Sequence, residues 1–149
     1  MNSDVGFGSE PHISLAGYDF HGLVMEPESL AAKQGVYVVM CLVSEKPHCV
    51  LDVGTAEGGT WGGGNIRKRP ARHNRRRCWH EHCHGTIAYA AHYVSDVETR
   101  LDIEGELRWK LDPPCGVSPW TIEPELGATY EQKFGPKGSL CIALSFPEG

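Results

Sequence analysis

The fold is decided by the run Val36-Tyr37-Val38-Val39-Met40-Cys41-Leu42-Val43, which follows Gly35. An uninterrupted run of β-branched, apolar and aromatic residues is typical of a strand buried on both faces of a sheet. Residues 44–48 form a polar turn, and Cys49–Val53 returns as a second apolar stretch. The sequence therefore predicts a β-hairpin at the centre of the domain.

A third strand and one long helix follow the hairpin. The alternating stretch Thr86–Val94 predicts the strand. The helix is expected over Val97–Leu111, because Ser95 or Asp96 can cap its start and prolines 113 and 114 prevent its continuation. The organised part of the chain is thus expected to lie within residues 34–116.

The two ends of the chain are less regular. Residues 1–33 predict a loop-rich N-terminal extension with one short helix near Pro27–Lys33. Residues 117–149 are rich in Pro, Gly and Glu and predict a C-terminal extension, with Leu140–Leu144 as a candidate extra strand.

The length and the cysteines bear on the compartment. A chain of 149 residues suits one domain. No apolar run approaches the roughly 18 residues of a membrane span, and the first twenty residues lack the basic start of a signal peptide. The six cysteines form no CxxC pair. We therefore expect a cytoplasmic protein, away from membranes, with reduced and mostly buried thiols.

The formal net charge of −5 conceals a strongly basic segment. Seven basic residues and no acid fall within eleven positions, which leaves a net charge of −12 on the remainder. Such a segment is typical of a surface that binds phosphodiesters, although exposed arginines can also serve solubility alone. The candidate nucleic-acid-binding residues here are Arg67, Lys68, Arg69, Arg72, Arg75, Arg76 and Arg77. Asn65 can cap a helix that starts at Ile66 and carries them, with Pro70 shortening or kinking it.

A glycine-rich loop over residues 54–64 precedes the basic segment. It is no P-loop, because no Gly-Lys-Ser/Thr follows it. A flexible loop or lid is the better interpretation. Trp61 within it is a candidate stacking surface for a base, and packing of Trp61 against the sheet is the alternative.

One carboxylate falls on the expected apolar stripe of the long helix. Val97, Leu101, Leu107 and Leu111 are expected to trace that stripe, and Glu104 lies seven residues from both ends of it. A carboxylate facing a core needs a partner, a proton or a metal ion. The alternative is an edge position from which the head group reaches water.

The segment Cys78-Trp79-His80-Glu81-His82-Cys83-His84 resembles a zinc-ligand cluster. On a strand, positions 78, 80, 82 and 84 would share one face. Structural zinc usually takes ligands in separated pairs, however, and no second pair is evident. A zinc-binding interaction domain is therefore the least favoured interpretation.

In order along the chain, these pieces resemble the GIY-YIG nuclease domain. Gly35-Val36-Tyr37 matches the first signature, and Asp52-Val53-Gly54 stands where the second, Tyr-Ile-Gly or Tyr-Val-Gly, is expected. Further matches are the basic segment with Arg69 and His73, the strand ending Tyr93-Val94, and Glu104-Gly105-Glu106-Leu107 before Pro113 and Pro114.

The resemblance implies an α/β (α+β) fold, in which a small three-stranded antiparallel sheet is flanked by helices. It implies a metal-dependent endonuclease that hydrolyses DNA phosphodiester bonds, with a role in DNA repair or restriction and with branched or single-stranded DNA among the candidate substrates. Glu104 would bind one Mg²⁺ or Mn²⁺ ion. Arg69 would neutralise charge on the phosphate, Tyr37 would orient or deprotonate the attacking water, and His73 would shuttle a proton.

The chain departs from the family pattern at three places. Asp52 replaces the second tyrosine, Gly116 stands where an asparagine is common, and residues 57–64 are an insertion. Asp52 could act as the base or as a second metal ligand. Alternatively, the chain is a non-catalytic nucleic-acid-binding module on the same fold.

Overall fold

The structure is a computed structural model that describes residues 11–56 and 75–138. A five-stranded antiparallel sheet forms its centre, with the strand order β2-β3-β6-β4-β5. The elements are β2 (His12–Leu15), β3 (Tyr18–Val24), the 3-10 helix η1 (Pro27–Ser29), β4 (Gly35–Val43), β5 (Lys46–Ala56), α2 (Arg76–His82), β6 (Thr86–Tyr93), α3 (Val97–Leu111), α4 (Pro119–Ile122) and α5 (Leu126–Phe134).

Strand β4 lies between β5 and β6 and is the core of the sheet, as its apolar run predicts. Every residue of β4 except Val43 is buried. The turn to β5 is shorter than expected, because Ser44 and Glu45 both adopt a positive φ and reverse the chain in two residues. Turns of this left-handed kind match the twist of the paired strands, so β5 starts at Lys46 rather than Cys49.

The expected three-stranded sheet is wrong in its number of strands. Strands β2 and β3 arise from residues that were expected to form loops, and β3 pairs with β6. Their patterns are short and interrupted by His and Gly, so alternation alone does not reveal them. The short helix expected near Pro27–Lys33 is present as η1.

Helix α3 has the bounds that the sequence predicts. The Asp96 side chain accepts hydrogen bonds from the backbone N–H of Thr99 at 2.9 Å and from its hydroxyl at 2.7 Å. Asp112 ends the helix in the left-handed conformation. Asp96 is therefore a side-chain N-cap of α3. The two prolines after Asp112 prevent the helix from continuing.

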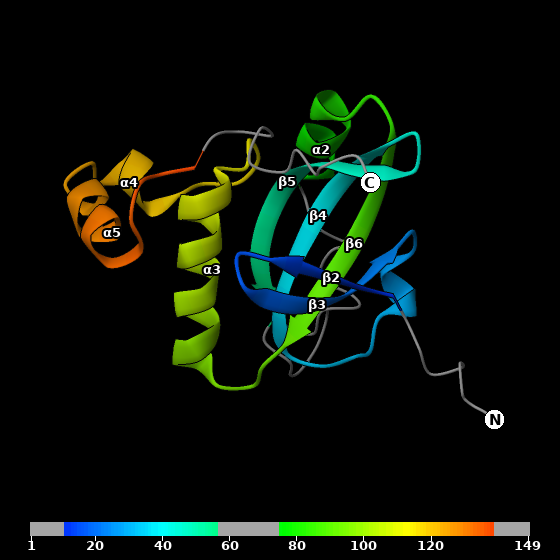
Figure 1. Ribbon diagram of the computed structural model, residues 1–149, viewed down its shortest axis with the longest axis horizontal. Coiled ribbons are helices and arrows are strands. Elements are labelled where there is room, and N and C mark those ends of the chain that lie inside the picture. The colour runs from blue at the N-terminus through cyan, green and yellow to red at the C-terminus, as the bar shows by residue number, and fades with distance from the viewer. Residues whose placement is uncertain (1–10, 57–74, 139–149) are drawn as a thin grey trace.

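The apolar stripe proposed for α3 is wrong at its first two positions. Val97 and Leu101 are more than half exposed, whereas Ile103, Leu107 and Leu111 are buried. The helix packs on two sides, since α3 lies along β5 and also contacts α5 (Figure 1). A single-stripe interpretation therefore mixed residues that belong to different faces.

A second helical layer, unforeseen in the sequence, covers the outer side of α3. The indole ring of Trp109 packs against Trp120 in α4 and Tyr130 in α5, with ring centroids 5.0 Å and 5.7 Å apart. Leu140–Leu144, the expected extra strand, lies outside the described residues.

The cysteines are not the reduced thiols that the sequence predicted. Disulfides join Cys41 to Cys83 and Cys78 to Cys115, Cys49 is also disulfide-bonded, and no cysteine is free in the described ranges. The cysteines joined in the first two disulfides are 42 and 37 residues apart in the sequence, and their Cα atoms are 5.5 and 5.9 Å apart. Only the folded chain brings them together, which is why local spacing misses them.

Within the described ranges, no helix is long and apolar enough to cross a membrane.

The turn between β2 and β3 is tied to α3 by a short chain of polar contacts. The Tyr18 hydroxyl donates to Oε1 of Glu106 at 2.6 Å, and Nζ of Lys110 donates to Oε2 at 2.5 Å. The hydrogen bond to Glu106, reinforced by burial, raises the pKa of Tyr18 to about 12.

We expect Glu106→Gln to lower the pKa of Tyr18 toward its ordinary value, because the carboxylate no longer opposes the tyrosinate. In the unchanged protein, the neutral Tyr18 contributes stability that is complete below pH 10 and is lost as the pH rises toward about 12. Carbon-13 NMR of labelled tyrosine rings measures the titration. Glu98→Gln, an exposed change on the same helix, is the control, and an equal shift in both variants would contradict the assignment.

Candidate functional site

The glycine of the second signature lies against the tyrosine of the first. Tyr37 in β4 and Gly54 in β5 are direct partners in the sheet. A Cβ atom at Gly54 would overlap the hydroxyl and ring of Tyr37, so only glycine leaves room for this side chain. Tyr37 is fully buried. The two signatures therefore meet at one place in the hairpin.

Asp52, which stands in place of the second tyrosine, is a fully buried carboxylate. Its Oδ1 accepts from Nη2 of Arg108 at 2.7 Å and from the backbone N–H of Val53 at 2.9 Å. Its Oδ2 accepts from Nε1 of Trp79 at 2.8 Å and lies 3.2 Å from Nε of Arg75. Four donors from β5, α2 and α3 thus surround one side chain.

Burial dominates the electrostatics of this cluster. It raises the pKa of the Asp52 carboxyl, a shift opposed by the charges of Arg75 and Arg108 and by the Trp79 hydrogen bond. It lowers the pKa of the Arg108 guanidinium, which the charge of Asp52 opposes. Each ion is costly to bury alone, so removing either partner is far more damaging than losing an exposed ion pair.

Arginines at both ends of α3 align the helix with β5. Arg100 donates from Nη1 to the carbonyl of Ala56 at 2.8 Å, and Arg108 donates from Nη2 to the carbonyl of Val53 at 2.7 Å. Both side chains are buried. They lie eight residues apart on one side of an antiparallel helix, so the residue midway between them faces the strand between Val53 and Ala56.

That midway residue is Glu104. Its side chain is 26% exposed, and its Oε2 lies 3.9 Å from Nε of Arg108. The carboxylate therefore lies at the edge of a cationic cluster, and part of it reaches solvent. Of the two expectations for Glu104, the edge position from which the head group reaches water is the one that the structure shows, and a cation, Arg108, lies beside it.

Gly116, the second departure from the family pattern, is explained by the same cluster. It has a φ of +87°, and a Cβ there would overlap guanidinium atoms of both Arg75 and Arg108. The two departures are thus linked in space. The carboxylate at 52 draws the two guanidinium groups inward, and the glycine at 116 leaves the space that they occupy.

The basic segment is described only at its end. Arg75 directly precedes α2 and turns inward to Asp52, whereas Arg76 and Arg77 are exposed on the helix. Nε of Arg77 lies 3.6 Å from Oε2 of Glu81. The remaining candidates lie outside the described residues: Trp61, Arg67, Lys68, Arg69, Arg72 and His73.

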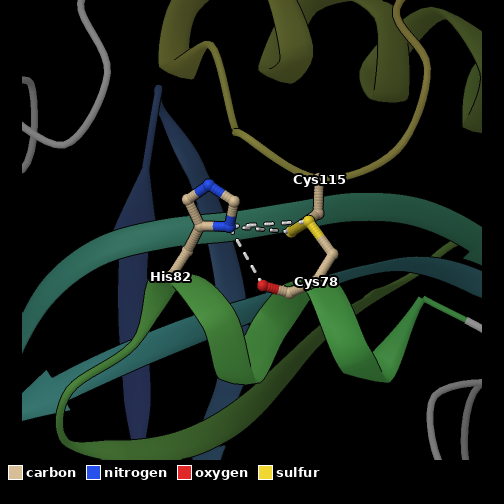
Figure 2. A group of neighbouring side chains, drawn as sticks. All are labelled: Cys78, His82 and Cys115. Atoms are coloured by element: carbon tan, nitrogen blue, oxygen red, sulfur yellow. Dashed lines mark hydrogen bonds between the residues drawn. A yellow bond between two sulfur atoms is a disulfide. The ribbon is translucent and has the colours of Figure 1, made fainter.

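The segment Cys78–His84 does not form the strand on which the zinc prediction depended. Residues 78–82 are in helix α2, and His80 and His84 are exposed. Helical spacing instead brings His82 beside Cys78, and the loop after α3 adds Cys115 (Figure 2). The third member of this group comes from a distant segment that sequence spacing cannot reveal.

Three further residues of the site were not predicted from the sequence: Arg100, Arg108 and Trp79. A signal was present for the arginines, since they flank Glu104 at four residues on either side of the same helix. Their inward direction was not predictable, because arginine on a helix is ordinarily exposed.

Comparison with protein-family models, with curated proteins and with solved structures gives no match. The functional interpretation therefore depends on the residues and the geometry described above.

We expect Asp52→Asn to lower the free energy of unfolding by about 3–5 kcal/mol, because it leaves the buried Arg108 guanidinium without a counter-charge. Urea unfolding measures the change, and Asp102→Asn, an exposed change on α3, should have little effect. A normally stable Asp52→Asn protein would contradict the role of Asp52 as the anchor of this cluster.

We also expect Gly116→Ala to be more destabilising than Gly17→Ala. The two glycines have nearly equal positive φ values, +87° and +89°, but a Cβ at Gly17 meets no atom within 4 Å. Gly17→Ala should therefore show the backbone cost alone, about 1–2 kcal/mol, and Gly116→Ala an additional loss from displaced guanidinium groups. Equal losses in thermal unfolding would mean that the space at Gly116 is unimportant.

Proposed function

We propose that this protein is a metal-dependent endonuclease of GIY-YIG type that hydrolyses DNA phosphodiester bonds. One observation carries the proposal: buried arginines on either side of the partly exposed Glu104 fix α3 to β5, and Gly54 of the same strand lies against Tyr37. We propose that Glu104 and Tyr37 thereby belong to one site at this edge strand.

Glu104 supplies one carboxylate, the kind of ligand that a hard divalent cation takes. Mg²⁺ and Mn²⁺ take oxygen ligands, and Mg²⁺ typically keeps several waters beside one or two carboxylates. Glu104 would hold the ion through its partly exposed carboxylate, with water and phosphate oxygens completing the shell. When bound, such an ion neutralises phosphate charge and lowers the pKa of a bound water. Asp52 is not included, because its two oxygens already accept four donors.

Tyr37 and Arg75 support the site in different ways. The Tyr37 hydroxyl lies over Gly54 and is buried with it, so a role of Tyr37 in orienting a water is proposed from the resemblance alone. Arg75 neutralises Asp52 and so prevents the buried carboxylate from repelling a phosphate nearby. Arg69 is proposed to stabilise charge on the scissile phosphate and His73 to transfer a proton, both from the resemblance alone.

The partner in this proposal is DNA, approached through the basic segment. Arg76 and Arg77 are the exposed members of that segment among the described residues. Contact with three or four phosphates corresponds to a log–log salt slope of about −3, at roughly 0.9 per phosphate. The proposed compartment is the cytoplasm, where a disulfide such as Cys78–Cys115 would be exposed to reduction.

A second candidate function is a non-catalytic nucleic-acid-binding module. The observation in its favour is that Asp52 replaces a family tyrosine and is held as a structural ion, with Gly116 adapted to it. In this alternative, the ion cluster around Asp52 keeps the fold stable although the catalytic tyrosine of the family is absent.

We expect Glu104→Gln to reduce Mg²⁺- or Mn²⁺-dependent DNA cleavage by at least about 100-fold, because the variant loses the proposed ligand of the metal ion. Supercoiled, single-stranded and branched DNA are the substrates, and Glu98→Gln, exposed at the start of α3, is the matched control. DNA binding and its salt slope should be unchanged in both variants, since neither substitution removes a basic residue.

Cleavage that survives Glu104→Gln would contradict the proposed mechanism. Salt-sensitive binding by the unchanged protein, without cleavage of any of the three DNA forms, would favour the non-catalytic module instead.

A further inference from the structure

A group of sulfur and nitrogen atoms joins helix α2 to the loop after α3. Cys78 and His82 lie one helical turn apart, and Cys115 faces them from the loop (Figure 2). Nδ1 of His82 is 3.6 Å from Sγ of Cys78 and 4.0 Å from Sγ of Cys115. The two sulfurs form a disulfide.

Contacts independent of the disulfide hold Cys115 in place. Its backbone N–H donates to the carbonyl of Leu51 at 3.0 Å, and its own carbonyl accepts from Nη1 of Arg108 at 3.1 Å. On the other side, α2 is anchored by Trp79, which is fully buried and bonded to Asp52. Reduction of the disulfide would therefore leave two thiols facing each other beside an imidazole.

The sulfur–nitrogen distances of this group approach those of a tetrahedral zinc site, whereas the two sulfurs are bonded to each other at 2.06 Å. With Zn–S of about 2.3 Å and Zn–N of about 2.0 Å, tetrahedral geometry separates sulfur from nitrogen by about 3.5 Å and the two sulfurs by about 3.8 Å. The two sulfur–nitrogen distances are already close to this value. The sulfurs need only move apart once their bond is broken, which side-chain rotation about Cys78 can supply.

We propose that the reduced protein binds one Zn²⁺ ion through Cys78, His82 and Cys115, with the fourth position open to water. Thiolate and imidazole are the ligands that zinc prefers, and the exposed His82 leaves the site accessible from solvent. Cys41 and Cys83 belong to no comparable group among the residues that the structure describes. The disulfide and the zinc ion are alternative links between the same two segments.

The exchange between the two links is balanced. A dithiol reductant supplies two electrons and two protons, its own sulfurs become a disulfide, and Cys78 and Cys115 become thiols. Zinc binding then releases those two protons as the thiolates bind the metal. Nδ1 of His82, now 3.0 Å from the carbonyl of Cys78 and donating its proton to it, would release that proton to solvent while Nε2 takes one up, and would turn the resulting lone pair to the metal.

Either link holds α2 at the same place relative to the Asp52 cluster. Arg75 precedes α2 and reaches Asp52, while Gly116 directly follows Cys115 and borders the same guanidinium groups. Zinc would therefore preserve the buried ion cluster and the exposed Arg76 and Arg77 in a reducing compartment, where the disulfide is not maintained. This role is structural and does not depend on cleavage activity.

The test uses the full chain, reduced with a phosphine and titrated with Co²⁺ and Zn²⁺ under anaerobic conditions. We expect one tightly bound ion and, with Co²⁺, the thiolate charge-transfer and tetrahedral ligand-field absorption bands. His82→Gln should lower the affinity at least about 100-fold, because the loss of a direct ligand exceeds the effect of losing an outer-shell partner. His80→Gln, an exposed change on the same helix, is the matched control.

The variants Cys115→Ser and Cys83→Ser separate this site from other thiols. Cys115→Ser should remove the charge-transfer band of the site, whereas Cys83→Ser should retain it. If the reduced chain unfolds without metal, Zn²⁺ should restore its circular dichroism spectrum, and failure to do so would overturn the proposal. Absence of binding by a folded reduced chain, or equal affinity in the two histidine variants, would overturn it as well.

Discussion

The buried ion pair between Asp52 and Arg108 is the interaction on which the rest of the site depends. It links the edge strand β5 to α3, and Trp79 and Arg75 add α2 to the same carboxylate. Two ions withdrawn from water tolerate little displacement, because each depends on the other for its counter-charge. The three elements around Asp52 are therefore held in one arrangement, and Glu104 takes its place from the alignment of α3 that results.

Asp52, its two arginines and Gly116 form one group of mutually compatible residues. An aspartate in place of a tyrosine would be costly at this depth by itself, because a buried carboxylate requires positive partners. Arg108 and Arg75 supply them, and Gly116 provides the space for their guanidinium groups. In the fold, Asp52 is the centre of this set, and it holds β5, α2 and α3 together.

The same region carries the two chemical features that the fold leaves accessible. Glu104, the ligand that we propose for a divalent cation, is a partly exposed carboxylate at the edge of the cluster. A group of softer ligands, suited to zinc in the reduced protein, joins α2 to the loop after α3 and consists of Cys78, His82 and Cys115. The two features differ in ligand chemistry, so one divalent ion is not expected to serve both. Their shared dependence on Asp52 and its arginines links the stability of α2 to the geometry around Glu104.

The sequence by itself determined the β4–β5 hairpin, β6 and the bounds of α3, because apolar runs, alternation and a capping aspartate act over a few neighbouring residues. It could not reveal β2 and β3, the helical layer of α4 and α5, or the disulfides. Only the tertiary structure decided that Arg108 turns inward to a residue 56 positions away and that Cys115 meets Cys78 across 37 positions. The physical reason is that burial and counter-charge are properties of the assembled core, and a local pattern contains neither.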